Sequence, residues 1–217
     1  MTPLTGEPRL HAQLRLYVIT DEREDATRLL PVIDAALRGG AGAVQLRRKA
    51  AGGRELLRLA GAIRELTARH GALFIVNDRV DVAWLADADG VHLGQEDIPC
   101  AQARRLLPGK IIGVSARTVE DARAAERAGA DYLGVGAVYA TGTKENACRI
   151  GLEGLGRIAR AVGIPVVGIG GIGPGGAAAV REAGAVGVAV VAAVMAAPDP
   201  CAAARALSLE VGPRPGR

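Results

Sequence analysis

The chain has 217 residues, of which 49% are hydrophobic and only 2% aromatic, and its formal net charge is +4. So few aromatic side chains argue against the base-stacking surfaces of nucleic-acid-binding modules, and so small a charge argues against a surface for duplex DNA. The length is typical of one domain with a sizeable core.

Short apolar runs alternate with helical patterns along the whole chain. Strands are predicted at 15–20, 43–47, 73–77, 90–93, 111–115, 132–136, 165–169 and 187–191. Residues 54–69 predict an amphipathic helix, since leucine and isoleucine recur on one face and arginine on the other. Thr118 predicts a helix start because Glu120 and Asp121 follow it, and acidic residues favour the first turn of a helix.

A weak internal repeat precedes four of these strands, at 40–44, 86–91, 128–133 and 183–188. Glycine in each segment permits the left-handed conformation that ends a helix. Eight strands, each followed by a helix, predict an α/β fold: a single TIM (β/α)8 barrel over residues 1–217, with a core at about 14–197 and flexible tails at both ends. A doubly wound open sheet is the alternative, and only the strand count separates the two.

The cysteines and the apolar stretches bear on location. Cys100, Cys148 and Cys201 are odd in number and far apart, which is typical of reduced thiols in a cytoplasmic protein. Residues 1–13 lack the apolar segment of a signal peptide, and 183–198 is too short for a membrane span. We therefore expect a cytoplasmic protein without membrane or nucleic-acid partners, and nothing in the sequence indicates its oligomeric state.

In such barrels the active site lies at the carboxyl ends of the strands. The second predicted strand ends in Arg47, Arg48 and Lys49, and alternation places Arg47 and Lys49 on one side with Arg48 opposite. An anion such as phosphate between two cations explains their proximity, whereas a pair of solvent-exposed loop charges is the alternative. Only three of the 27 basic residues are lysines, and two of them follow strands, which favours a need for a compact ammonium there.

Two carboxylates follow the third and fourth predicted strands. Asp78 and Asp97 would lie on neighbouring strands, and such a pair suits Mg²⁺, which fills its remaining positions with water and substrate phosphate. Pairing of Asp78 with Arg79, or a helix-capping role, is the alternative for each carboxylate alone. His92 lies within a strand, which favours a hydrogen-bonded core histidine over a general base.

Hydroxyl groups and glycines mark the later strands. Ser115 ends the fifth strand, and Thr141, Gly142, Thr143 and Lys144 follow the sixth with groups that suit an oxyanion, although alone they indicate only a charged turn. The glycines of 168–176 would let the backbone approach a ligand closely, and the next helix start would offer N–H donors to a phosphate. The residues thus predict a divalent metal with one anion site and a second phosphate site, as an enzyme joining a diphosphate to a phosphorylated partner would need.

Seven segments, taken in order, resemble the thiamine-phosphate synthase family. They are QLRRK (45–49), VNDRVDVA (76–83), GVHLGQED (90–97), GVSART (113–118), TGTK (141–144), GLEGL (151–155) and VGIGGI (167–172). The resemblance covers residues 14–197 and implies a TIM barrel. It also implies a reaction in which hydroxymethylpyrimidine diphosphate loses pyrophosphate, by way of a pyrimidine carbocation, and joins a thiazole phosphate to give thiamine phosphate.

The resemblance implies a role for each residue that matches a family motif. The pyrimidine diphosphate would be held by Gln45, Leu46, Arg47, Arg48, Lys49 and Asn77, Mg²⁺ by Asp78 and Asp97, the leaving pyrophosphate by Ser115 and Lys144, and the thiazole phosphate by Thr141, Gly142, Thr143, Gly171, Val191 and Ala192. Lys144, Ser115 and Arg47 would be catalytic. Glu96 is expected to be a loop residue or to act behind Asp97.

The sequence departs from the family pattern at three places. Tyr139 and Ala140 precede Thr141 where the family has Phe-Pro, Ala192 replaces a serine, and residues 116–117 read Ala-Arg instead of Thr-His. These changes concern the thiazole site. The rival functions are a tautomerase-like or regulatory paralogue on the same barrel, which would need no diphosphate or metal, and a phosphate-ligand sensor without turnover.

Overall fold

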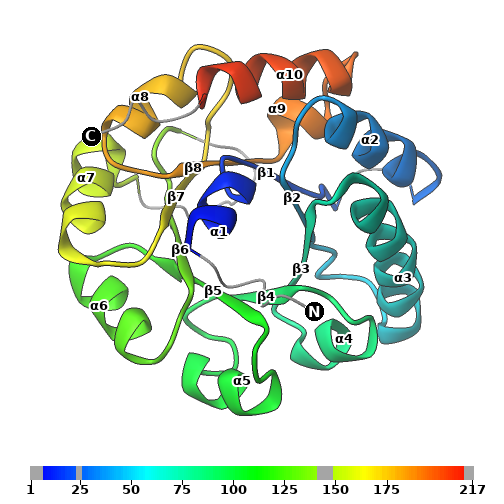
Figure 1. Ribbon diagram of the computed structural model, residues 1–217, viewed down its shortest axis with the longest axis horizontal. Coiled ribbons are helices and arrows are strands. Elements are labelled where there is room, and N and C mark those ends of the chain that lie inside the picture. Colours follow the sequence, from blue (N-terminus) through cyan, green and yellow to red (C-terminus); the bar gives the residue numbers. More distant parts are fainter. Residues whose placement is uncertain (1–6, 23–25, 141–148, 213–217) are drawn as a thin grey trace.

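The computed structural model describes residues 7–22, 26–140 and 149–212 (Figure 1). Eight parallel strands close into a barrel in sequence order, with β8 paired to β1. The pairing of the last strand with the first excludes the open-sheet alternative and confirms the predicted TIM barrel. The prediction of flexible tails outside residues 14–197 is wrong in part, because residues 7–13 and 200–210 form helices. Residues 1–6 and 213–217 lie outside the described ranges.

The strands agree with the sequence prediction to within one residue at either end. They are β1 (Leu16–Ile19), β2 (Ala43–Leu46), β3 (Leu73–Asn77), β4 (Gly90–Leu93), β5 (Ile111–Ala116), β6 (Tyr132–Gly136), β7 (Val166–Ile169) and β8 (Gly187–Val190). The described helices are α1 (Glu7–Gln13), α2 (Ala26–Arg38), α3 (Gly53–His70), α4 (Val80–Leu85), α5 (Cys100–Leu106), α6 (Val119–Arg127), α7 (Gly151–Ala161), α8 (Ala177–Glu182), α9 (Ala192–Met195) and α10 (Pro200–Glu210).

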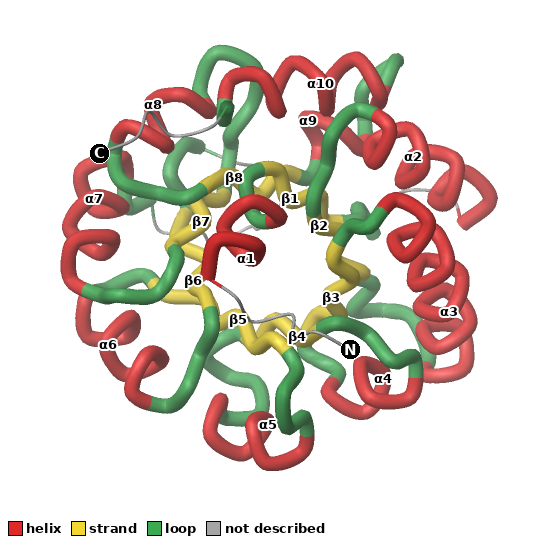
Figure 2. Tube along the Cα trace, viewed as in Figure 1, coloured by secondary structure: helices red, strands yellow, loops and turns green. Residues whose placement is uncertain are grey.

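The core has two layers, because successive side chains of each strand point to opposite faces. Outward-facing residues such as Val18, Val44 and Val76 pack against the ring of helices, which surrounds the strands in Figure 2. Inward-facing residues, among them Tyr17 and Tyr132, fill the barrel. Among the described residues no helix combines the length and apolar character that crossing a membrane requires.

Helix α1 covers one end of the barrel and lies over its centre in Figure 1. Leu10 and Leu14 are buried with the inward-facing residues, and the Gln13 amide donates to the carbonyl of Gly71, just before β3. These contacts place α1 at the amino ends of the strands, so that the carboxyl ends form the opposite face. Helices α1 and α10 extend the structure beyond the predicted core of 14–197.

The barrel closes where the last strand, β8, pairs with the first strand, β1, and we call this pairing the seam. Leu16, Tyr17 and Val18 pair with Val188, Ala189 and Val190. Helix α10 packs against α2 and β1 at this seam and buries Ala204 and Leu207. The helix comes so close that a Cβ atom on Gly39, just after α2, would lie 2.5 Å from the carbonyl oxygen of Cys201.

The predicted helix ends are borne out with one exception. Thr118 and Asp121 form a capping box at the start of α6. Positive φ angles at Gly40, Gly129 and Gly184 end the preceding helices as the repeat predicted. In the segment 86–91, however, the left-handed residue is Asp87 (φ 47°), because an aspartate also tolerates this region.

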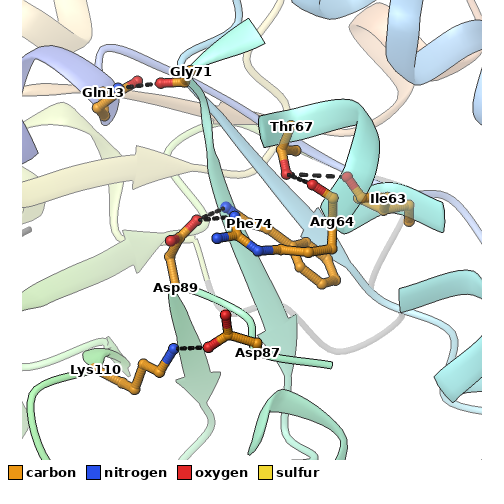
Figure 3. Close-up of polar contacts among 9 residues, drawn as sticks. All are labelled: Gln13, Ile63, Arg64, Thr67, Gly71, Phe74, Asp87, Asp89 and Lys110. Atoms are coloured by element: carbon orange, nitrogen blue, oxygen red, sulfur yellow. Dashed lines mark hydrogen bonds and ion pairs between the residues drawn. The ribbon is translucent and has the colours of Figure 1, made fainter. Parts of the chain in front are cut away.

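Polar contacts hold the amino ends of β3, β4 and β5 (Figure 3). The buried carboxylate of Asp89 accepts from the Phe74 backbone N–H at 2.8 Å and from Arg64 at 3.2 Å. Lys110, immediately before β5, pairs with Asp87 at 2.5 Å. These charges therefore stabilise the face of the barrel opposite the predicted active site.

Candidate active site

Asp78 and Asp97 come together at the carboxyl ends of β3 and β4. The backbone N–H of Asp78 donates to the carbonyl of His92 at 2.9 Å, which fixes Asp78 to the neighbouring strand in a left-handed conformation (φ 60°). The loop after β4 turns back, and Asp97 Oδ2 accepts from the Gly94 N–H at 2.7 Å. The two carboxyl groups lie within hydrogen-bonding reach of each other, as their positions on adjacent strands predicted.

The surroundings make ionisation of Asp78 less favourable than it is for an aspartate in water. Burial raises the pKa of Asp78, and the neighbouring Asp97 carboxylate raises it further, while the Lys49 ammonium 3.0 Å away opposes both effects. Among the described residues no group of three histidine, cysteine, aspartate or glutamate side chains converges on a metal position. Two hard carboxylates beside each other nevertheless fit Mg²⁺, which takes one or two such ligands and completes its shell with water and phosphate.

The repulsion between these carboxylates predicts an effect on stability. Because the folded-state pKa of Asp78 is raised, its stabilising contribution is present below its ordinary pKa and is lost as pH rises through the folded value. Asp97→Asn removes the neighbouring charge and keeps an oxygen for Gly94. Without Mg²⁺ at pH 7, we expect this variant to melt about 2–4 °C above the wild type, as a gain of about 1 kcal/mol would give.

Thermal melting in chelator checks this expectation. The difference between Asp97→Asn and the wild type should shrink as the pH falls and Asp78 takes up its proton, because the raised pKa of Asp78 reflects the neighbouring charge. Millimolar Mg²⁺ should raise the wild-type Tm more than that of the variant. A variant less stable than the wild type in chelator at pH 7 would contradict the proposed repulsion.

The three basic residues after β2 contact three different carboxylates. Arg47 Nη1 lies 3.2 Å from Glu22, Lys49 Nζ lies 3.0 Å from Asp78, and Arg48 turns toward Glu55 of α3 at 3.7 Å. Arg48 thus separates from the other two, as strand alternation predicted. Glu22 also accepts from the backbone N–H groups of Lys49 and Ala50, so this carboxylate, which the sequence analysis missed, organises the end of β2.

The predicted pyrimidine-site residues differ in where their side chains point. Gln45 is buried inside the barrel and donates from Nε2 to the Tyr17 hydroxyl at 2.7 Å. Leu46 is fully buried in the outer layer against the helices, so only its backbone is available to a ligand. Asn77 ends β3, half-buried and in register with His92.

Ser115 near the end of β5 belongs to a line of hydrogen bonds. His92 Nε2 lies 3.0 Å from Ser115 Oγ, and His92 Nδ1 lies 3.0 Å from the Tyr132 hydroxyl. The prediction of a hydrogen-bonded histidine within the strand is confirmed. Its partner is a predicted site residue, which ties the interior of the barrel to the site.

The predicted thiazole-phosphate residues are described only in part. Thr141, Gly142, Thr143 and Lys144 lie outside the described residues. Gly171 has φ 68°, and a Cβ atom there would lie 2.3 Å from the Ala140 carbonyl oxygen, so glycine is required beside the start of that loop. Val191 precedes α9, and Ala192 begins it with its side chain exposed.

The prediction that the start of the helix after the glycine-rich segment offers its N–H groups to a phosphate is wrong. The N–H groups of Gly175 and Ala177, at the start of α8, donate to Glu210 at 2.8 and 3.2 Å. This carboxylate, 33 residues after Ala177, occupies the helix start where phosphate was expected. The glycines before it, Gly170 and Gly171, are the part of the segment that approaches the predicted site.

The closed barrel gathers carboxylates, cations and a serine hydroxyl at the carboxyl ends of its strands, the face at which TIM-barrel enzymes carry their active sites. A family model described as thiamine monophosphate synthase matches residues 16–194. The chain belongs to this family.

Individual relatives with the same family name are similar to this chain over most of its length. A thiamine-phosphate synthase of Moorella thermoacetica is 56% identical over 198 residues, which cover 90% of this chain and 94% of the relative. One of Pyrococcus furiosus is 50% identical over 193 residues, 88% of this chain and 91% of the relative. The solved structure of a thiamine phosphate pyrophosphorylase from Pyrococcus furiosus matches with a TM-score of 0.87 at 46% identity, covering 93% of this chain and 97% of that one.

Proposed function

We propose that this enzyme joins hydroxymethylpyrimidine diphosphate to hydroxyethylthiazole phosphate, or its carboxylated form, with release of pyrophosphate. The observation that carries the proposal is the Asp78–Asp97 pair with Lys49 beside it, in a chain at least 50% identical to relatives named thiamine-phosphate synthase. In the reaction the bond between the pyrimidine methylene carbon and the diphosphate oxygen breaks, and the leaving oxygen keeps the electron pair. The thiazole nitrogen then forms the new bond to that carbon.

The proposal includes Mg²⁺ held by Asp78 and Asp97. When bound, the ion would supply positive charge to the diphosphate oxygens. Arg47 and Lys49 would orient the diphosphate, and Ser115 and Lys144 would donate hydrogen bonds to pyrophosphate as its charge grows. The thiazole phosphate would lie against Thr141–Thr143, Gly171 and residues 191–192, where the main chain would replace the serine hydroxyl that Ala192 lacks.

The rival functions have less support. A tautomerase-like or regulatory paralogue would need neither a diphosphate site nor a metal, yet the chain has both aspartates and the Arg47–Lys49 segment. As part of the same proposal we place the enzyme in the cytoplasm, since Cys100 and Cys201 are free thiols.

Turnover tests this function directly. Purified protein incubated with both substrates and Mg²⁺ should form thiamine phosphate and pyrophosphate in equal amounts, and excess EDTA should stop the reaction until Mg²⁺ is restored. Binding of both substrates without pyrophosphate release would instead identify a sensor or a non-synthase paralogue. Activity unaffected by EDTA would refute the metal while leaving the synthase assignment in place.

A further inference from the structure

The interior of the barrel contains a continuous line of hydrogen bonds between two predicted substrate-binding residues. Starting from Gln45 on β2, the line passes through Tyr17 on β1, Tyr132 on β6 and His92 on β4, and it ends at Ser115 on β5. The four donor–acceptor distances are 2.7, 2.9, 3.0 and 3.0 Å. The line thus crosses the interior of the barrel.

Two glycines make room for this line. A Cβ atom on Gly113 would lie 2.1 Å from Tyr132 Cζ, and a Cβ atom on Gly134 would lie 2.9 Å from His92 Cε1. No side chain larger than hydrogen fits beside the phenol and the imidazole in these positions. The neighbouring strands are therefore built around the two rings, which fixes where both can lie.

Burial of the two tyrosines determines the direction of the hydrogen bonds. Tyr17 and Tyr132 are fully buried, and burial raises the pKa of both phenols, so each keeps its proton. Among the described residues the Tyr17 hydroxyl contacts Gln45 Nε2, which can only donate, and the Tyr132 oxygen. With the Gln45 amide in this orientation, Tyr17 donates to Tyr132, since a buried hydroxyl without an acceptor is costly.

The remaining directions follow in turn. Because Tyr132 accepts from Tyr17, its own proton goes to Nδ1 of His92, which must then be unprotonated. A neutral imidazole carries its single proton on the other nitrogen, so Nε2–H donates to Ser115 Oγ. With an oxygen lone pair of Ser115 engaged in this way, the serine proton is not donated to His92 and is left for another acceptor.

We propose that Tyr17, Tyr132 and His92 are positioning residues that hold the Ser115 hydroxyl as a hydrogen-bond donor to the leaving pyrophosphate. The inference rests on the proposed function, because it is the departing diphosphate that would receive this hydrogen bond. A donor fixed in advance toward developing negative charge lowers the barrier without tightening substrate binding. A serine free to turn its proton to the imidazole would lose that advantage.

The tautomer of His92 can be measured without any substrate. The chain has three histidines, and ¹⁵N NMR of the imidazoles, with His92→Gln identifying the resonances, distinguishes a protonated from an unprotonated ring nitrogen. We expect Nε2 protonated and Nδ1 unprotonated in the wild type at neutral pH. The opposite tautomer would overturn the proposal, even if the enzyme makes thiamine phosphate, and the expected tautomer in an inactive protein would instead count against the proposed function.

A double-mutant cycle tests the action on Ser115. Tyr132→Phe removes the hydroxyl that orders the imidazole and should lower kcat about three- to tenfold, as loss of about one hydrogen bond implies, with KM for the pyrimidine diphosphate unchanged. In a Ser115→Ala background the same change should have no further effect on kcat.

Thr67→Val is the control. The buried Thr67 hydroxyl lies outside the line and donates to the Ile63 carbonyl at 3.0 Å, so this variant should alter Tm but not kcat. Independent, multiplicative losses from Tyr132→Phe and Ser115→Ala would refute the proposal.

Discussion

Replacing Asp97 by asparagine is expected to reduce Mg²⁺-dependent formation of thiamine phosphate by about 100-fold or more. A metal ion bound at a developing anion stabilises the transition state by several kcal/mol, and each 1.36 kcal/mol of that stabilisation corresponds to about tenfold in rate. Asparagine keeps an oxygen for the Gly94 N–H, so the loop after β4 should stay in place while the charge is lost. Asp78→Asn should be similarly damaging because it removes the other carboxylate. It should leave the backbone in place, since asparagine tolerates the left-handed conformation at that position.

Initial rates of pyrophosphate release over a series of Mg²⁺ concentrations provide the measurement, with circular dichroism to verify folding. Glu96→Gln is the matched control, since Glu96 is an exposed carboxylate next to Asp97 and should keep wild-type rates. Near-wild-type activity of Asp78→Asn and Asp97→Asn at limiting Mg²⁺ would remove the basis for the metal site.

Replacing Lys144 by alanine should lower kcat by about 10²–10³, with little change in affinity for the pyrimidine diphosphate. A donor that contacts pyrophosphate more strongly in the transition state lowers the barrier, and loss of one such donor typically has this effect. Lys144→Arg should recover only part of the rate, because a planar guanidinium cannot replace a compact ammonium. Single-turnover rates and equilibrium binding of the diphosphate separate the two effects.

Lys110 provides the control for Lys144. Its ammonium pairs with Asp87 at the amino ends of the strands, on the face opposite the site, so Lys110→Ala should be nearly silent in catalysis (Figure 3). Equal damage from Lys110→Ala and Lys144→Ala would contradict the assignment of Lys144 to the active-site face.

The sequence predicted the strands closely because each is a short segment rich in valine, leucine or isoleucine that lies between helical patterns. Asp78 and Asp97 were predictable as neighbours for a related reason, since consecutive strands of a parallel barrel lie side by side. The helix start at Thr118 was predictable because acidic residues in the first turn are a local signal, and the structure adds that Thr118 and Asp121 form a capping box.

The long-range carboxylates were not predictable in this way. Glu22 reaches the end of β2 from the end of β1, and Glu210 reaches the start of α8 from the end of α10. No local spacing relates either glutamate to the N–H groups it accepts from, because tertiary packing alone brings them together. The line from Gln45 to Ser115 was hidden for the same reason, although Gly113 and Gly134 mark the space it needs.

The seam between β8 and β1 has a consequence for how the chain folds. The paired segments Leu16–Val18 and Val188–Val190 are 172 residues apart, so local strand–helix units can form early whereas closure must wait for the most distant contact. During synthesis the edge of β1 stays open until β8 has left the ribosome, and α10 covers the seam only afterwards. Nascent chains that stop before residue 187 therefore expose an unpaired strand edge, and these are the chains that chaperones would need to protect.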